Sequence, residues 1–181
     1  MPTTTTTKRL VLEPVTPDHV DELHALSSDP RVWSHLPAGR HTSREQTAEQ
    51  VSRFVKSWTD HGLGYWVARD REGAFVGVGG CMAAGTGTWN VYYRITPDQQ
   101  RRGYAVEISE AGIAAAHGTD ADRPVTAYLL EHNVASKATI ERIGLQLVSR
   151  GPEPGMPDAV RLIYADRDLD EATLRRLVAH T

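Results

Sequence analysis

The chain has 181 residues, of which 40% are hydrophobic and 24% are charged, and its formal net charge is −3. This composition suits one globular domain with its own core. The acidic balance argues against a general nucleic-acid binder, which would present a basic face. Cys81 is the only cysteine, so the chain can form neither a disulfide framework nor a cysteine-based metal site.

No apolar run approaches the roughly 20 residues that a membrane helix needs, and the threonine-rich start lacks the apolar core of a signal peptide. We therefore expect a soluble, cytoplasmic protein with no membrane and no nucleic-acid partner. We expect a single domain over residues 1–181, with a disordered tail at residues 1–8 and a C-terminal helical extension at residues 168–181.

Hydrophobic periodicity and turn residues predict strands and helices mixed in one α/β (α+β) domain. Thr16-Pro17-Asp18 is typical of a helix start, and Ser43-Arg44-Glu45-Gln46 forms a capping box. The expected order is a strand, two helices, a three-stranded antiparallel meander, a central helix, a strand, a short helix, a final hairpin and a last helix. The expected strands are residues 9–15, 64–69, 74–82, 89–95, 124–130, 145–150 and 160–165, and a Pro/Gly-rich loop at residues 151–158 joins the last two.

The stretch from Trp89 to Glu107 joins a strand to the central helix through a polar turn. Pro97 cannot donate a ladder hydrogen bond, so the strand should end before it. A helix start leaves about four backbone N–H groups unpaired and attracts anions, and a glycine there lets the backbone approach a ligand closely. We interpret this turn as a pyrophosphate site, with an ordinary strand-to-helix turn as the alternative. Its residues are Gln100, Arg101, Arg102, Gly103, Tyr104 and Ala105.

A second informative stretch runs from Asn133 to Leu145. On a helix, residues three and four apart are neighbours, so Asn133, Ser136 and Ile140 share one face. The Asn133 side chain can cap the helix or contact a ligand amide. A capped amphipathic helix in which Ser136 has no special role is the alternative.

A Gln-x-x-Gly-x-Ala turn followed, one strand later, by Asn-x-x-Ser and a glycine-ended helix resembles the GNAT superfamily of acyl-CoA-dependent N-acetyltransferases. The resemblance extends from Arg9 to about Ala165. It is closest to the Rim-type branch, which acetylates ribosomal-protein N-termini, and to small-molecule relatives of that branch. The segments that carry it are Arg9-Leu10-Val11-Leu12, Val76-Gly77-Val78-Gly79-Gly80, Gly103-Tyr104-Ala105-Val106-Glu107 and Asn133-Val134-Ala135-Ser136.

The resemblance implies a mostly antiparallel central sheet, flanked by helices and splayed at a cleft for acetyl-CoA, the co-substrate. The pantetheine arm would pair with the backbone of Arg94, Ile95 and Thr96, and the pyrophosphate would rest on the turn at residues 100–105. Asn133 and Ser136 would border the cofactor. A neutral amine, from a small molecule or a protein N-terminus, would attack the thioester directly. The resemblance leaves a homodimer open.

The catalytic groups depart from the common family pattern. Many members supply a proton from a tyrosine seven residues after the asparagine, where this chain has Ile140. The Rim-type branch uses the serine, which Ser136 matches, so Ser136 is the expected proton donor. Asn90 occupies a position where relatives carry a glutamate base. Glu131, His132, a water chain or an amine that arrives neutral remain alternatives for the base.

The other candidates are weaker. The histidines lack a metal-binding spacing, so we expect no metal. Trp33, Trp58 and Trp66 could line an acceptor pocket but fit a core better. By the resemblance, the acceptor is read mainly by residues 29–42 and the loop at residues 151–158, and Glu153 and Asp158 there would suit a cationic amine. The alternative functions are a degenerate acyl-CoA-binding or sensing domain and a purely structural protein.

Overall fold

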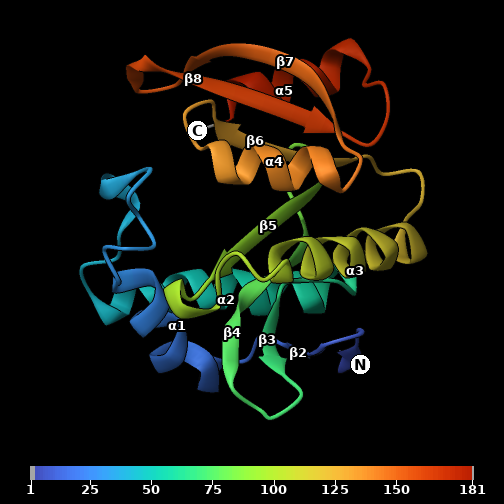
Figure 1. The fold of residues 1–181 in the computed structure, drawn as a ribbon. Coiled ribbons are helices and arrows are strands. Elements are labelled where there is room, and N and C mark those ends of the chain that lie inside the picture. Colours follow the sequence, from blue (N-terminus) through green and yellow to red (C-terminus); the bar gives the residue numbers. More distant parts are fainter. Residues whose placement is uncertain (1–2, 181) are drawn as a thin grey trace.

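The computed structural model describes residues 3–180, which form one eight-stranded sheet with the order β1-β2-β3-β4-β5-β6-β8-β7 (Figure 1). The strands are β1 (Thr5–Thr6), β2 (Leu10–Pro14), β3 (Trp66–Asp70), β4 (Phe75–Ala83), β5 (Trp89–Ile95), β6 (Val125–Leu130), β7 (Gln146–Glu153) and β8 (Met156–Ala165). The α-helices are α1 (Val20–Ser28), α2 (Arg44–His61), α3 (Tyr104–Thr119), α4 (Val134–Arg142) and α5 (Glu171–Ala179).

The sheet is antiparallel except where β5 meets β6. These two parallel strands pair only at Trp89 with Val125 and at Asn90 with Thr126. Beyond that point they separate, so the following residues of β5 and β6 face each other without ladder hydrogen bonds. This divergence leaves backbone groups on both facing edges, which an extended ligand can bind as an added strand does.

Two apolar clusters cover the two faces of the sheet. One contains Trp89, Val91 and Ile95 of β5 together with Ile108 of α3, and the other packs α1 and α2 against residues such as Tyr92. Because strand side chains alternate between faces, odd-numbered residues of β5 point towards α3 and even-numbered ones towards α1 and α2. Figure 1 shows α3 and α2 on opposite sides of the strands.

A pair of glycines sets the close approach of α3 to the sheet. A Cβ atom at Gly112 would lie 2.7 Å from the Gly80 carbonyl carbon on β4. Only glycine allows this contact, because real Cβ atoms do not approach backbone so closely. The start of α3 is thereby fixed beside the end of β5.

The structure differs from the expected disordered tail at residues 3–8, and residues 1 and 2 of that tail lie outside the described residues. Thr5 and Thr6 form β1, which pairs with β2, and the Thr7 hydroxyl donates to the Glu107 carboxylate at 2.5 Å. Threonine has a high strand propensity, and the added edge pairing together with the Glu107 contact orders the segment. Composition alone gave no sign of this long-range partner.

The expected loop at residues 151–158 is also wrong. β7 continues to Glu153 and β8 begins at Met156, so Pro154 and Gly155 alone form the turn. Pro152 is tolerated because β7 is an edge strand, where a missing N–H disrupts no second ladder. At the C-terminus α5 begins at Glu171, and the Asp170 side chain caps it by accepting from the Thr173 N–H.

Candidate active site

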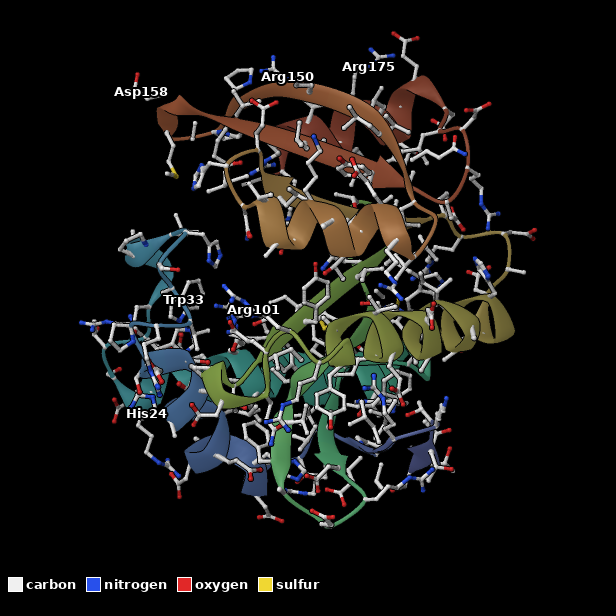
Figure 2. The ribbon with its side chains drawn as sticks, viewed as in Figure 1. His24, Trp33, Arg101, Arg150, Asp158 and Arg175 are labelled. Carbon is white, nitrogen blue, oxygen red and sulfur yellow. The ribbon has the colours of Figure 1, made fainter. Side chains whose placement is uncertain are left out.

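The separation of β5 and β6 opens a cleft of about 770 Å³. Its other walls are the segment between α1 and α2, the turn before α3, the first half of α4 and the β7–β8 turn. Figure 2 shows Trp33 and Arg101, which both line it, in the space between the two halves of the molecule. Among the site residues expected from the sequence, Thr96 and Arg102 do not line the cleft, whereas the following do: Arg94, Ile95, Gln100, Arg101, Gly103, Tyr104, Ala105, Asn133 and Ser136.

The turn at residues 100–105 has the backbone form of an anion site, and we call it the anion-binding turn. Arg101 (φ 62°) and Gly103 (φ 80°) both have left-handed backbone. The Gln100 N–H donates to Pro97 and the Glu107 N–H to Gly103, but no N–H in residues 101–106 has an acceptor among the described residues. Successive N–H groups in such a turn form a concave site for anions, and the start of a 16-residue helix adds partial positive charge.

Two further features lie in or beside this turn, namely polar groups without hydrogen-bond partners and a strained backbone residue. The Thr96 hydroxyl oxygen and the Gln99 side-chain carbonyl are buried without a hydrogen-bond partner among the described residues. Arg101 is a non-glycine residue in left-handed conformation, which costs about 1–2 kcal/mol. Unsatisfied groups and backbone strain gather at binding sites, where a ligand can compensate for them. The N–H groups of the anion-binding turn fit the diphosphate of acetyl-CoA.

The N-terminal segment holds the anion-binding turn from outside. Arg9 donates from its backbone N–H and from Nε to the two Glu107 carboxylate oxygens, both at 2.7 Å, and from Nη1 to the Arg102 carbonyl at 2.7 Å. Its guanidinium also lies 4.6 Å from the centre of the Tyr104 ring. Burial alone would raise the Glu107 pKa, but hydrogen bonds from Thr7 and Arg9 lower it below its ordinary value. Glu107 therefore remains ionised and joins the chain start to α3.

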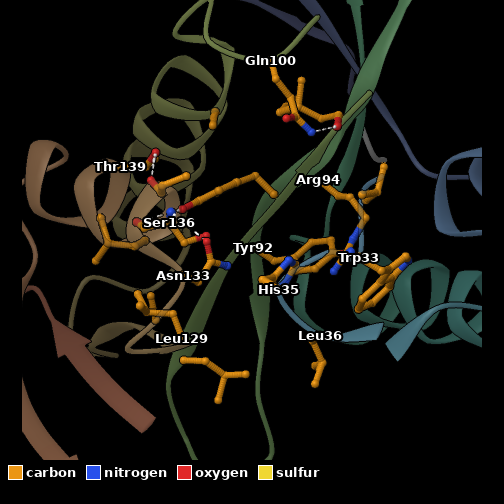
Figure 3. A pocket seen from close by; sticks show the side chains of 18 of the residues that line it. Trp33, His35, Leu36, Tyr92, Arg94, Gln100, Leu129, Asn133, Ser136 and Thr139 are labelled. Atoms are coloured by element: carbon orange, nitrogen blue, oxygen red, sulfur yellow. Dashed lines mark hydrogen bonds between the residues drawn. The ribbon is translucent and has the colours of Figure 1, made fainter. Parts of the chain in front are cut away.

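The start of α4 places Ser136 in the cleft. The Asn133 side chain accepts from the Ser136 N–H at 3.2 Å, as a helix cap does. The Tyr93 hydroxyl donates to the Ser136 carbonyl at 3.2 Å, and burial raises the pKa of Tyr93. In Figure 3, Asn133, Ser136 and Thr139 form one wall of the cleft. Ile140, at the family's tyrosine position, also lines it and brings no proton donor.

The opposite wall comes from β5 and the segment between α1 and α2. The Arg94 guanidinium lies 3.5 Å from the centre of the Trp33 ring, and its Nε donates to the Tyr92 hydroxyl at 2.8 Å (Figure 3). Trp33 is itself anchored, because its indole N–H donates to the Ser27 carbonyl at 2.6 Å. Stacking and hydrogen bonding thus fix the arginine in one orientation.

His35 lies beside this group, with its ring stacked on Trp33 at 6.1 Å between centroids. Its backbone carbonyl is 2.7 Å from His132 Nε2, a contact that links the segment after α1 to the segment before α4. Burial lowers the pKa of His35 below 6.5, and the positive charges of Arg94 and His132 lower it further. His35 is therefore a neutral imidazole near pH 7.

The base candidates from the sequence have other partners. Both carboxylate oxygens of Glu131 accept from the Arg150 guanidinium, at 2.7 and 2.9 Å, which lowers the Glu131 pKa. Asn90 lines the cleft and donates to the Tyr65 hydroxyl at 2.8 Å. His132 contacts His35 as described. None of the three combines a cleft position with a free basic atom.

The remaining candidates fall outside the cleft. Trp58 and Trp66 lie in the core, as the sequence favoured. Cys81 is buried, which raises its pKa and suppresses thiolate chemistry. Within residues 3–180 no three His, Cys, Asp or Glu side chains gather as metal ligands, and no helix there is long and apolar enough to cross a bilayer.

A family model described as an acetyltransferase (GNAT) domain matches residues 9–146, which span the cleft from the Arg9 contacts to α4. The chain belongs to the GNAT acetyltransferase family. The expected fold, enzyme class and acetyl-CoA co-substrate agree with this membership. A comparison with curated proteins finds no match.

Solved GNAT structures share the whole fold at low sequence identity. A protein described as a GNAT-family acetyltransferase from Bordetella pertussis has a TM-score of 0.78 and 21% identity, over 91% of this chain and 99% of its own. An acetyltransferase from Agrobacterium tumefaciens has a TM-score of 0.77 and 23% identity, over 92% and 95%. RimL, a ribosomal-protein acetyltransferase in complex with coenzyme A, has a TM-score of 0.70 and 20% identity, over 91% and 98%.

Sequence reasoning missed three parts of the site. Thr7 and Arg9 brace the anion-binding turn, His35 enters the cleft, and the Arg94 side chain, rather than only its backbone, faces it. Arg94 could have been noticed, because strand alternation places it on the face opposite Tyr93 and Ile95. The other contacts join segments far apart in the sequence, for which the chain gives no local sign.

Proposed function

We propose that this protein transfers the acetyl group of acetyl-CoA directly to a primary amine, on a small molecule or a protein N-terminus. The single observation that carries the proposal is the run of unpartnered N–H groups at residues 101–106, which opens into the same cleft as Ser136. An anion site next to a polar hydroxyl and a splayed strand pair suits a long ligand with a diphosphate at one end and a reactive thioester at the other.

The residues that would hold acetyl-CoA follow from this geometry. The anion-binding turn would take the diphosphate, with Arg101 adding positive charge, and the edge of β5 at Arg94 and Ile95, which faces the cleft, would take the pantetheine amides. Thr96, expected from the sequence to share this role, has both backbone groups paired, with Val76 and Gln99. Asn133, already used as a helix cap, fixes the α4 wall of this site. When bound, acetyl-CoA supplies the activated acyl carbon, and the protein supplies position and proton transfer.

Ser136 is the proposed proton donor to the departing thiolate. It lines the cleft at the start of α4 and is held in place by the Asn133 cap and the Tyr93 contact at its carbonyl. Ile140 leaves no tyrosine to share this role. A general acid must lie within hydrogen-bond reach of the atom it protonates, which the rigid helix start allows.

His35 is the proposed base that takes a proton from the amine. Of the described residues lining the cleft, only His35 and Glu153 carry an imidazole or a carboxylate. The Glu153 oxygens both accept from the buried Arg161 guanidinium at 2.6 Å. His35 is neutral near pH 7, as a base at that pH must be.

The second candidate function is acyl-CoA binding without catalysis. It is favoured by Asn90 and Ile140, which stand where family members carry a base and an acid. Both functions predict acetyl-CoA binding, and they differ only in amine-dependent release of CoA.

The test combines turnover with binding. Purified protein is incubated with acetyl-CoA and a panel of small amines and short peptides with free N-termini, and free CoA is measured with a thiol reagent. We expect amine-dependent release of CoA and an acetylated amine by mass spectrometry. Tight acetyl-CoA binding by calorimetry, without release for any amine, would establish the binding function instead.

Ser136→Ala isolates the proton donor. We expect kcat to fall by about 10²- to 10⁴-fold, the usual contribution of general acid catalysis, with little change in acetyl-CoA affinity. Ser136→Thr, which keeps a hydroxyl, should retain a larger share of the activity. Equal rates for Ser136→Ala and the unaltered protein would remove Ser136 from the mechanism.

A further inference from the structure

Arg94 is exceptional among the arginines of the described chain. The other arginines that are shielded from solvent are Arg9, Arg69, Arg123 and Arg161, and each has a carboxylate partner within 4.0 Å. Arg94 is also partly buried, yet no carboxylate of residues 3–180 lies within that distance. A partly buried charge without a partner destabilises the folded protein, and a ligand that carries a negative charge would compensate it.

The orientation of Arg94 leaves its terminal nitrogens available. Its only hydrogen bond among the described residues runs from Nε to the Tyr92 hydroxyl, while the flat face of the guanidinium stacks on Trp33. Both contacts fix the group without using Nη1 or Nη2. A planar guanidinium held in this way can bind a carboxylate or phosphate through two parallel hydrogen bonds.

This end of the cleft is also positive rather than acidic. The Arg94 charge contributes to the lowered pKa values of His35 and His41, after the larger effect of burial. Glu153 is neutralised by Arg161, and Asp158 is exposed at the tip of β8, pointing away from the cleft (Figure 2). Glu153 and Asp158, which the sequence suggested would suit a cationic amine, therefore present no free carboxylate to this end of the cleft.

The Arg94 side chain lies apart from the proposed diphosphate site. It lies on the β5 face towards α1 and α2 and stacks on Trp33, which comes from the segment expected to read the acceptor. The anion-binding turn lies at the start of α3, and its Arg101 has no carboxylate partner among residues 3–180. The cleft thus has two separate cationic positions, and the diphosphate occupies only one of them.

We propose that the acceptor of this enzyme carries an anionic group, a carboxylate or a phosphate, in addition to its amine, and that the stacked Arg94 guanidinium binds that group. The inference rests on the proposed acetyl transfer and narrows its substrate class. Free amino acids and aminoalkyl phosphates belong to this class, and simple alkylamines and polyamines do not.

The experiment compares acceptors that differ only in the anion. Alanine is paired with alaninamide, several larger amino acids with their amides, and phosphoethanolamine with ethanolamine. For each compound kcat/KM is measured by CoA release at saturating acetyl-CoA, and binding to the CoA-loaded protein is measured by calorimetry. The carboxylate and phosphate series show which anion fits. The amine of an amino-acid amide is less basic than that of the free amino acid, so a larger fraction of it is neutral and able to attack. This difference favours the amides and therefore cannot by itself produce a preference for the free amino acids.

We expect the anionic member of at least one series to be preferred by about 10- to 100-fold in kcat/KM and in affinity, the usual worth of a hydrogen-bonded charge partner. In Arg94→Gln this preference should disappear, so that the two members of each pair react and bind alike. Arg94→Lys, which keeps the charge but loses the planar fork, should retain part of the preference. Arg44→Gln, which removes a surface arginine paired with Asp21, is the matched control and should change nothing.

Three outcomes would overturn the inference. Equal kcat/KM and equal affinity within every pair would show that no anion is recognised. An Arg94→Gln variant that raises only the KM for acetyl-CoA would assign Arg94 to the cofactor. A preference that survives in Arg94→Gln would place the anion elsewhere. In each case, release of CoA with amines that lack an anionic group would uphold the proposed acetyl transfer. Absence of CoA release with every amine would refute acetyl transfer, and calorimetry would then still test whether Arg94 binds the anion.

Discussion

The two ends of the cleft are built in different ways. The anion-binding turn is one continuous segment, residues 100–105, and its N–H groups and left-handed residues are adjacent in the chain. The acceptor end is assembled from the segment after α1, from β5 and from the β7–β8 turn. A diphosphate is common to every acyl-CoA ligand and can be met by one fixed backbone device. An acceptor differs from enzyme to enzyme and is met by side chains on separate segments.

The partners of the charged groups differ in the same way. At the cofactor end Glu107 and Arg9 satisfy each other and brace the turn from outside. At the acceptor end Arg94 is held by aromatic rings and keeps its charge for a ligand. We propose that the first arrangement gives a rigid anion site and that the second gives selectivity for the acceptor. Breaking each end separately should therefore give different defects.

The largest effect is expected at the anion-binding turn. Gly103→Glu places a negative charge at the proposed diphosphate site, and like charges in contact cost several kcal/mol, so acetyl-CoA affinity should fall by about a thousandfold or more. Calorimetry measures the affinity, and circular dichroism checks the fold.

Gly103→Ala is the control for the backbone, because it carries the same strain at φ 80° without the charge. A Cβ atom there would come no closer than 3.4 Å to the Arg9 guanidinium. Its loss of affinity should be much smaller than that of Gly103→Glu. Equal affinity for Gly103→Glu and the unaltered protein would show that the diphosphate binds elsewhere.

The next effect is expected at His35. His35→Gln should lower kcat/KM by about a hundredfold, as loss of a general base does, while acetyl-CoA affinity stays unchanged. Glu131→Gln is the control, because the Glu131 carboxylate is already paired with Arg150 and should not contribute to turnover. The reverse pattern would make Glu131 the base.

The pH dependence of His35 follows from the direction of its pKa shift. Burial, Arg94 and His132 lower the pKa below 6.5, so the ring should stay neutral at pH values where an ordinary histidine is half protonated. An NMR titration should show this, and Arg94→Gln should move the pKa back up. Because the unfolded chain binds the proton more readily, this group should destabilise the fold as the pH falls below 6.5. A His35 pKa at or above 6.5 would contradict the assignment.

The smallest effect is expected at the brace. Glu107→Gln removes the ion pair with Arg9 and should lower the free energy of unfolding by about 1–3 kcal/mol at neutral pH, with a several-fold loss of acetyl-CoA affinity. The Glu107 pKa lies below its ordinary value of 4.5, so its stabilisation is present above that pH and is lost as the pH falls through the lowered pKa. Urea unfolding of both proteins should therefore give values that converge in acid.

Glu110→Gln on the same helix is the matched control for the brace. Glu110 is exposed, and its side chain has no hydrogen-bond partner among the described residues. The variant should unfold like the unaltered protein at every pH. If Glu107→Gln behaved in the same way, the N-terminal segment would contribute nothing to the anion-binding turn.

The sequence by itself determined the features that depend on neighbours along the chain. The end of β5 before Pro97, the left-handed Gly103, the Ser43 capping box and the Asn133 cap each follow from residues within a few positions of one another. Such features need no knowledge of distant partners, because local hydrogen bonds and backbone sterics decide them. The polar turn before α3 and the start of α4 could each be predicted from these local features, and the resemblance to the GNAT superfamily joined them into one expected site.

Only the tertiary structure decided how the distant segments meet. The ordered chain start depends on Glu107, a hundred residues after Thr7, and the extension of β7 past Pro152 depends on its place at the edge of the sheet. The acceptor end depends on Trp33 meeting Arg94 across the fold. These contacts are set by packing between elements, which leaves no periodic or local trace in the sequence. The anion-binding turn could therefore be predicted from the chain alone, whereas the meeting of Trp33 and Arg94 at the other end of the cleft required the fold.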